Sequence, residues 1–160
     1  MEQPAPVRVC VRVRPLNARE SACAASPVVA CADPTTLEVM TPGVGDDAPP
    51  TVRAFRFDLC CHDGFSQADF FEHSGVQPLV DAALAGLQAT VLAYGPTGSG
   101  KTYTQFGPPK SMKAASEKLG ENGGVGTVQP NGIIQPEHGF ILRTGFAALA
   151  HVDEVNARAG

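Results

Sequence analysis

The sequence lacks the features that mark membrane, secreted and nucleic-acid-binding proteins. No apolar run among its 160 residues is long enough to span a bilayer, and residues 1–6 do not form a signal peptide. The five cysteines are odd in number and have no framework spacing, so we expect reduced thiols in the cytoplasm. A net charge of -4 gives no electrostatic footprint for nucleic acid. We therefore expect neither a membrane nor a nucleic acid among the partners.

The cysteines and histidines also lack the spacing of a metal site. Cys60 and Cys61 are adjacent, without the two-residue gap that lets two thiolates face one zinc ion. His73, His138 and His151 are scattered, and none has a second ligand at helical spacing. We predict buried or half-exposed free thiols here, and no zinc site.

The strongest signal in the chain is the phosphate-binding motif G-x-x-x-x-G-K-[ST] at residues 95–102. Residues 90–94 are rich in β-branched and aromatic side chains and predict a short buried strand before it, and a helix can begin at Lys101. Glycines let backbone N–H groups turn toward an anion, Lys101 would reach the β- and γ-phosphates, and the Thr102 hydroxyl would bind Mg²⁺. The predicted nucleotide site consists of Gly95, Pro96, Thr97, Gly98, Ser99, Gly100, Lys101 and Thr102.

Period-two patterns predict strands in the N-terminal third of the chain. Valines alternate with arginines and a cysteine over residues 7–13, which predicts a strand with one apolar face that ends at Pro15. By periodicity alone, its arginines fit the solvated face of an edge strand. We expect further strands at 35–40 and 52–57, joined by a turn-rich excursion over 41–50.

Capping signals predict two helices before the phosphate-binding motif. Ser66 followed by Asp69 is typical of a capping box at a helix N-terminus. Gly75 and Pro78 indicate a break and a restart, after which apolar residues repeat at helical spacing up to Gly86, a suitable C-terminal cap. The first helix is expected to begin with Phe70 and Phe71 as core anchors. The second is expected to pack an apolar stripe, and nothing in it indicates catalysis.

Three stretches together resemble the kinesin motor domain. Residues 7–17 resemble its opening strand, Phe55–Asp58 its second signature, and residues 75–104 its phosphate-loop block almost residue for residue. The resemblance implies an α/β fold with a P-loop NTPase-type central sheet flanked by helices. It also implies ATP and Mg²⁺ as cofactors, the microtubule as a partner, and a location on the cytoskeleton in the cytoplasm. Pro96 stands where the family usually has glutamine, which we expect to alter loop stiffness more than phosphate contact.

The resemblance also implies a site for the adenine base. Arg12 and Pro15 fall where the family lines the adenine pocket, and Tyr103 falls where a ring stacks on the base. A planar ring and a guanidinium can hold a purine between them. This changes the interpretation of Arg12 from a solvated edge residue to a ligand contact, whereas Arg14 is expected to have a structural role at the turn out of the strand.

Beyond the phosphate-loop block the periodicity is lost and then returns. Residues from about 108 to 132 are rich in glycine and charge and predict a flexible insertion. Residues 139–143 resemble the point at which kinesins restart the interrupted helix, which we expect to continue through Val152. Arg143 matches the family arginine in type, and no catalytic role is assigned to it.

Two motifs that the family requires are absent: Asn-x-x-Ser-Ser-Arg-Ser-His and Asp-Leu-Ala-Gly-Ser-Glu. They hold the γ-phosphate, Mg²⁺ and the attacking water. We therefore expect residues 1–160 to be the N-terminal part of an incomplete kinesin motor domain, inactive alone and without the microtubule-facing segments, and no residue is predicted to be catalytic. One alternative is a non-catalytic nucleotide-binding or interaction module derived from a P-loop ATPase. A P-loop kinase or phosphotransferase is a weaker alternative, because it leaves the N-terminal motif unexplained.

Overall fold

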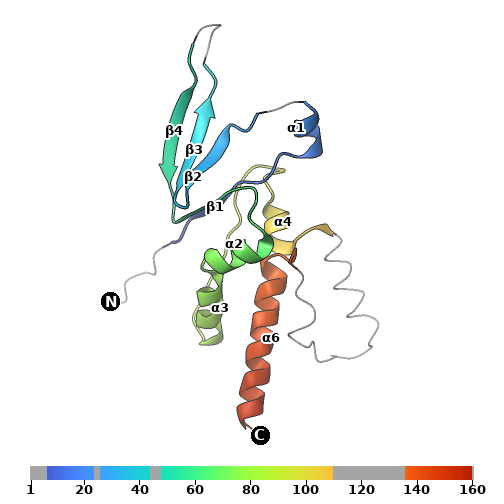
Figure 1. Cartoon of the computed structure of the whole chain (residues 1–160). Coiled ribbons are helices and arrows are strands. Elements are labelled where there is room, and N and C mark those ends of the chain that lie inside the picture. The colour runs from blue at the N-terminus through green and yellow to red at the C-terminus, as the bar shows by residue number, and fades with distance from the viewer. Residues whose placement is uncertain (1–6, 24–25, 44–47, 110–135, 160) are drawn as a thin grey trace, which may run out of the picture. The chain divides into compact units, whose positions relative to one another are not determined.

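The computed structural model describes residues 7–23, 26–43, 48–109 and 136–159, and the chain divides into two compact units, residues 1–65 and 66–160 (Figure 1). The elements of the first unit are β1 (Cys10–Arg12), α1 (Ala18–Ala22), β2 (Val29–Asp33), β3 (Thr36–Thr41), β4 (Thr51–Arg56) and β5 (Leu59–Cys61). Those of the second unit are α2 (Gln67–His73), α3 (Val76–Leu84), α4 (Lys101–Phe106) and α6 (Phe140–Ala159). None of these helices is long and apolar enough to cross a membrane.

The first unit contains two small sheets (Figure 1). β1 and β5 pair in parallel, with Val11 opposite Cys60, while β2, β3 and β4 form an antiparallel sheet in which Leu37 lies opposite Phe55. The antiparallel pairing confirms the predicted strands at 35–40 and 52–57. The opening strand is shorter than predicted, because only Cys10–Arg12 pairs with the three residues of β5. The helix α1 and the strands β2 and β5 were not predicted.

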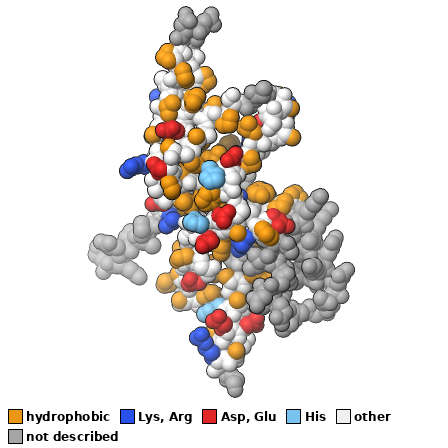
Figure 2. Space-filling model, viewed as in Figure 1, with side chains coloured by type: hydrophobic (Ala, Val, Ile, Leu, Met, Phe, Trp, Pro, Cys, Tyr) orange, Lys and Arg blue, Asp and Glu red, His pale blue; other side chains and the backbone are white. Residues whose placement is uncertain are grey.

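Apolar residues of the first unit are only partly buried. Leu37, Leu59, Cys60 and Cys61 form its buried part, while several large side chains of the antiparallel sheet stay exposed (Figure 2). All five cysteines are free, which confirms the prediction of free thiols, and Cys60 and Cys61 are the buried ones. Burial, reinforced by the neighbouring Cys10 and Cys31, raises the pKa of Cys61 to about 12. This thiol therefore stays protonated at neutral pH.

The helices of the second unit begin and end at the predicted signals. The Ser66 side chain accepts from the Asp69 backbone N–H and the Asp69 carboxylate accepts from Ser66, which completes the predicted capping box. α3 restarts after Gly75, whose φ of 80° is left-handed. At its other end Leu87 N–H donates to Ala82 O and Gly86 N–H to Ala83 O, both at 3.0 Å, so the predicted cap at Gly86 closes the helix as a Schellman motif.

Aromatic packing joins α2 to α6 within the second unit. The rings of Phe70 in α2 and Phe140 in α6 stack with centroids 5.2 Å apart, and Phe71 meets Phe140 edge-on at 5.8 Å. The Arg143 guanidinium lies 5.9 Å from the Phe71 ring centroid. α6 begins at Phe140 and extends past Val152, which confirms the predicted restart of the helix.

The predicted strand before the phosphate-binding motif is wrong. Residues 90–94 do not form a strand, and Leu92 and Tyr94 are 83% and 95% exposed. A strand forms only through hydrogen bonds with a neighbouring strand, and no described residue pairs with this segment. β-propensity alone therefore did not determine its structure. All of the predicted insertion at 108–132 except its first two residues lies outside the described residues.

Candidate functional site

The phosphate loop is a tight turn that leads directly into α4. Ser99 N–H donates to Pro96 O at 3.2 Å, and the helix begins at Lys101 as predicted. Gly98 and Gly100 have φ values of 82° and 97°, which residues with a side chain rarely adopt. Since a Cβ at either position would meet no atom within 4 Å, glycine is required there for backbone conformation and not for space.

Lys101 folds back over the loop that precedes it. Its Nζ donates to Gly95 O and Pro96 O, each at 2.8 Å, so the ammonium group lies beside the loop backbone. An ammonium group has three donors and no acceptor. Lys101 can therefore exchange contacts with two neutral carbonyl groups for contacts with anionic phosphate oxygens, which make stronger hydrogen bonds.

Ser99 and Thr102 supply the hydroxyl groups of the loop. The Ser99 Oγ is a buried polar atom with no hydrogen-bond partner among the described residues, and a Cβ at Gly95 would lie 2.6 Å from it. Buried polar atoms normally have a partner, so this one leaves a place for a polar ligand atom. Thr102 is exposed at the start of α4 and can offer an oxygen to a metal.

These groups fit a nucleotide phosphate with its magnesium ion. The loop offers a lysine, an unpartnered hydroxyl and glycine-rich backbone, which are the donors that phosphate requires. Within the described ranges, no group of three His, Cys, Asp or Glu side chains could hold a metal by itself. Mg²⁺ is usually held by few protein oxygens together with phosphates and water, so the single hydroxyl of Thr102 is compatible with it.

Two residues outside the motif hold α4 in place. The buried Gln67 side chain in α2 donates to the backbone oxygen of Tyr103. Gly139 lies so close to α4 that a Cβ there would be 2.5 Å from Gln105 C and Phe106 N. Neither role was predicted from the sequence. Gly139 stands beside a predicted helix start, but nothing in the sequence shows which backbone it would meet.

The predicted base contacts lie in different units. Tyr103 is 45% exposed on α4, next to the loop and in the same unit. Arg12 and Pro15 belong to the first unit, where the Arg12 Nη2 donates to Phe65 O at 3.1 Å and Pro15 is exposed. The residues of the phosphate loop are thus together within one unit, and the described structure does not test the three base contacts as a set.

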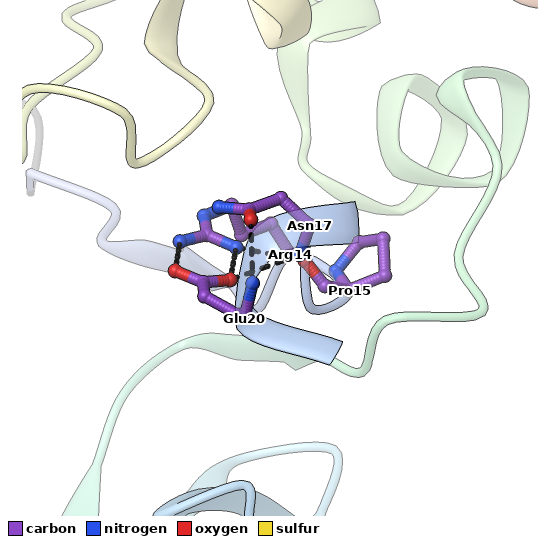
Figure 3. Close-up of polar contacts among 4 residues, drawn as sticks. All are labelled: Arg14, Pro15, Asn17 and Glu20. Atoms are coloured by element: carbon purple, nitrogen blue, oxygen red, sulfur yellow. Dashed lines mark hydrogen bonds and ion pairs between the residues drawn. The ribbon is translucent and has the colours of Figure 1, made fainter. Parts of the chain in front are cut away.

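Arg14 has the structural contact expected of it at the turn after β1. Its guanidinium forms an ion pair with Glu20 at 2.6 Å, and Nη1 also donates to Pro15 O at 2.9 Å (Figure 3). The Glu20 pKa falls to about 2, first because Arg14 donates to the carboxylate and then because the Asn17 backbone does.

The sequence is similar to one protein-family model and to several curated proteins. The family model of the kinesin motor domain matches residues 12–135. The mouse kinesin-like protein KIF12 is 38% identical over 104 residues, which cover 65% of this chain and 15% of that protein. Human centromere-associated protein E is 34% identical over 107 residues, which cover 67% of this chain and 4% of that protein.

A solved structure supports the same relationship at the level of the fold. It is described as a fast kinesin, with implications for its ATPase mechanism and interactions with microtubules. The match has a TM-score of 0.59 and 29% sequence identity, and it covers 86% of this chain and 30% of the other. The chain therefore spans a small part of the relatives it matches.

Proposed function

The chain belongs to the kinesin motor domain family and has the α/β fold of that family in part, and from this we propose that it is the ATP-binding part of a microtubule motor. In the full-length protein, ATP hydrolysis would be coupled to movement along microtubules. The chain matches only 15% of the mouse relative, so the activity belongs to a longer protein in this proposal.

The observation that carries the proposal is the phosphate loop. Lys101 lies beside Gly95 O and Pro96 O, and Ser99 Oγ is buried without a partner in the same turn. We propose that Lys101 binds the β- and γ-phosphates and that Thr102 provides an oxygen to Mg²⁺, which would neutralise phosphate charge. The remaining contacts would come from Pro96, Thr97, Gly98, Ser99 and Gly100.

The base is proposed to contact residues from the family motif. Tyr103 would stack on adenine, and Arg12 and Pro15 would line its site. The exposure of Tyr103 and of Pro15 supports this, because neither ring is buried against its own unit. Gln67 and Gly139 would act through α4, by fixing the helix that carries Lys101, Thr102 and Tyr103.

A microtubule-stimulated ATPase assay on the full-length protein tests the proposal. We expect stimulated turnover in the wild type, none in Lys101→Ala, and unchanged turnover in Arg158→Ala, which removes an exposed positive charge at the end of α6. ATP binding without stimulated turnover would favour the non-catalytic nucleotide-binding module. We further propose that the 160-residue chain alone does not hydrolyse ATP, because neither of the two switch motifs occurs in its sequence. We also propose that it does not bind microtubules, because it lacks the microtubule-facing segments.

A further inference from the structure

The C-terminal end of α4 lies in backbone contact with the turn that leads into α6 (Figure 1). A Cβ at Gly107, which follows α4 as its C-cap, would lie 2.5 Å from Glu137 O, and one at Gly139 would lie 2.5 Å from Gln105 C. Distances this short leave no room for a side chain on either glycine. Two backbone segments that are distant in the sequence therefore touch directly, and the position of one determines that of the other.

Arg143 in α6 holds this turn from the other side. Its Nε donates to His138 O at 2.8 Å and its Nη2 donates to Pro136 O at 3.0 Å. These two residues stand on either side of Glu137, whose own carbonyl oxygen faces the end of α4. The guanidinium also lies 5.9 Å from the Phe71 ring centroid in α2, which restricts its movement. Because its donors form a rigid planar fork, Arg143 fixes the orientation of both peptide groups.

α4 depends on such contacts for its position. It has six residues, too few for a helix to be stable by itself, and Gly100 at its start has no side chain to cap it. Gln67 holds its middle through Tyr103 O, and the turn before α6 holds its C-terminal end. The helix rises only about 1.5 Å per residue, so a displacement of its end also moves Lys101 and Thr102 at its start.

We propose that Arg143 is a positioning residue for the phosphate site: by holding the turn at 136–138 against Gly107, it keeps α4 in the place from which Lys101 binds phosphate. The proposal rests on the proposed function, because it takes Lys101 as a phosphate contact. Arg143 does not touch the nucleotide in it. Its effect depends on backbone contacts, so it requires the two hydrogen bonds of the guanidinium and not only a positive charge.

The test compares binding of ATP and of inorganic tripolyphosphate, which has no base, by calorimetry on the full-length protein with Mg²⁺. Arg143→Gln should weaken both ligands about 10-fold, because it displaces the helix that carries the phosphate contact. Arg143→Lys keeps the charge but loses the planar fork, so its loss should be smaller, about 3-fold. Arg158→Gln, which removes an exposed positive charge at the far end of α6, is the charge-matched control and should change neither ligand.

A second comparison separates positioning from stability. Val76 is buried at the start of α3, so Val76→Ala should lower the urea midpoint without changing either affinity. Arg143→Gln should lower the midpoint and the affinities together.

Gly107→Ala disturbs the same contact from the side of α4, because its Cβ would press on Glu137 O, and it should also weaken both ligands. The double variant of Arg143→Gln and Gly107→Ala should lose less than the product of the two single losses, since both act on one contact. A loss equal to that product would mean that the two residues act independently, which overturns the proposal.

The outcomes separate the positioning role from the function on which it rests. Normal affinities in Arg143→Gln with a lowered urea midpoint overturn the proposal, and so does a loss for ATP alone or full affinity in Arg143→Lys. In each case, phosphate binding that is lost in Lys101→Ala still supports the nucleotide site. If the wild type binds neither ligand, or if Lys101→Ala binds both normally, the proposed function fails and the positioning role fails with it. Should Arg143→Gln not fold, the affinities of Arg143→Lys relative to Val76→Ala decide the question in the same way.

Discussion

Two turns in this chain each lead into a short helix, and they satisfy their polar groups in opposite ways. Before α1, the Asn17 side chain accepts from the Glu20 backbone, and the Glu20 carboxylate binds both Arg14 and the Asn17 backbone. Before α4, Gly100 has no side chain to cap the helix, and Ser99 Oγ has no partner. In the first turn, the charged side chains pair with each other and with the backbone of the turn. The second leaves polar groups that a ligand can use.

This difference indicates where binding free energy can come from. A network that is already satisfied gains little from a ligand, but it can hold a neighbouring residue in position. Among the described residues, the Ser99 hydroxyl has no partner and Lys101 donates to two neutral carbonyl groups, so this loop gains stronger hydrogen bonds when an anion binds. Substitutions in the phosphate loop should therefore affect ligand binding, and those in the turn before α1 should affect the stability of that turn.

The largest effect is expected from Lys101→Ala in the full-length protein. Loss of charge-assisted hydrogen bonds worth about 1.5–3 kcal/mol each should weaken ATP binding by about 100-fold or more. Tripolyphosphate should weaken equally, because Lys101 is proposed to bind phosphates alone. Displacement of a fluorescent ATP analogue measures both ligands, with Arg158→Ala as the charge-matched control. Unchanged affinity would contradict the phosphate-loop interpretation.

A smaller loss is expected from Gly100→Ala. The φ of 97° at Gly100 costs a residue with a Cβ about 1–2 kcal/mol, although no atom lies within 4 Å of that position. Both ATP and tripolyphosphate should then bind about 5- to 30-fold more weakly. Gly145→Ala is the matched control, since it adds a Cβ in open space within α6 and should stabilise the helix slightly. If Gly100→Ala binds normally, the loop conformation described here is not the one that binds.

Local signals in the sequence predicted the helices of the second unit better than the strands, although the short helix α1 was missed. The capping box at Ser66 and the Schellman motif at Gly86 each depend on residues within a few positions of one another. The strand β5 lacks such signals, because its pairing with β1 joins residues about 49 positions apart. β2 pairs locally with β3, but its small residues did not indicate a strand in the sequence. The segment 90–94 has strand composition without a partner, and it is exposed.

In the candidate site, too, local features were predicted from the sequence and long-range contacts were not. The motif at 95–102 predicted the turn and the start of α4, because glycine conformation and helix initiation are local properties. The contact of Gln67 with Tyr103 spans 36 positions, and the close approach of Gly139 to α4 spans 34. Neither can be predicted without knowing how α2, α4 and α6 pack.

Tyr103→Ala tests whether Tyr103 contacts the base of the nucleotide and not its phosphates, by comparing two ligands that bind the second unit. If the ring stacks on adenine, its removal should weaken ATP binding by about 1–3 kcal/mol and leave tripolyphosphate nearly unchanged. Tyr103→Phe keeps the ring and should bind both ligands normally. Calorimetry with the two ligands measures the split. A parallel loss of ATP and tripolyphosphate in Tyr103→Ala would instead place the ring in the packing of α4.

The smallest effect is expected from the pH dependence of the ion pair before α1. Arg14, and then the Asn17 backbone, lower the Glu20 pKa from 4.5 to about 2. A carboxyl whose pKa is lowered by folding stabilises the folded state at pH values above the unfolded pKa, and this contribution is lost as the pH falls through the folded pKa. The stability of wild type over Glu20→Gln should thus be full above about pH 4.5 and should disappear by about pH 2.

Urea unfolding of the full-length protein and of Glu20→Gln between pH 7 and pH 2 measures this dependence. The pair is partly exposed and screened by water, so the difference at pH 7 should be small and should decrease further in high salt. Glu72→Gln, which changes an exposed carboxylate of α2, provides the control and should show no such trend. A difference between wild type and Glu20→Gln that stays constant down to pH 2 would mean that it does not come from the charge on Glu20. In that case the capping hydrogen bonds, and not the charge on Glu20, would hold the turn before α1 closed.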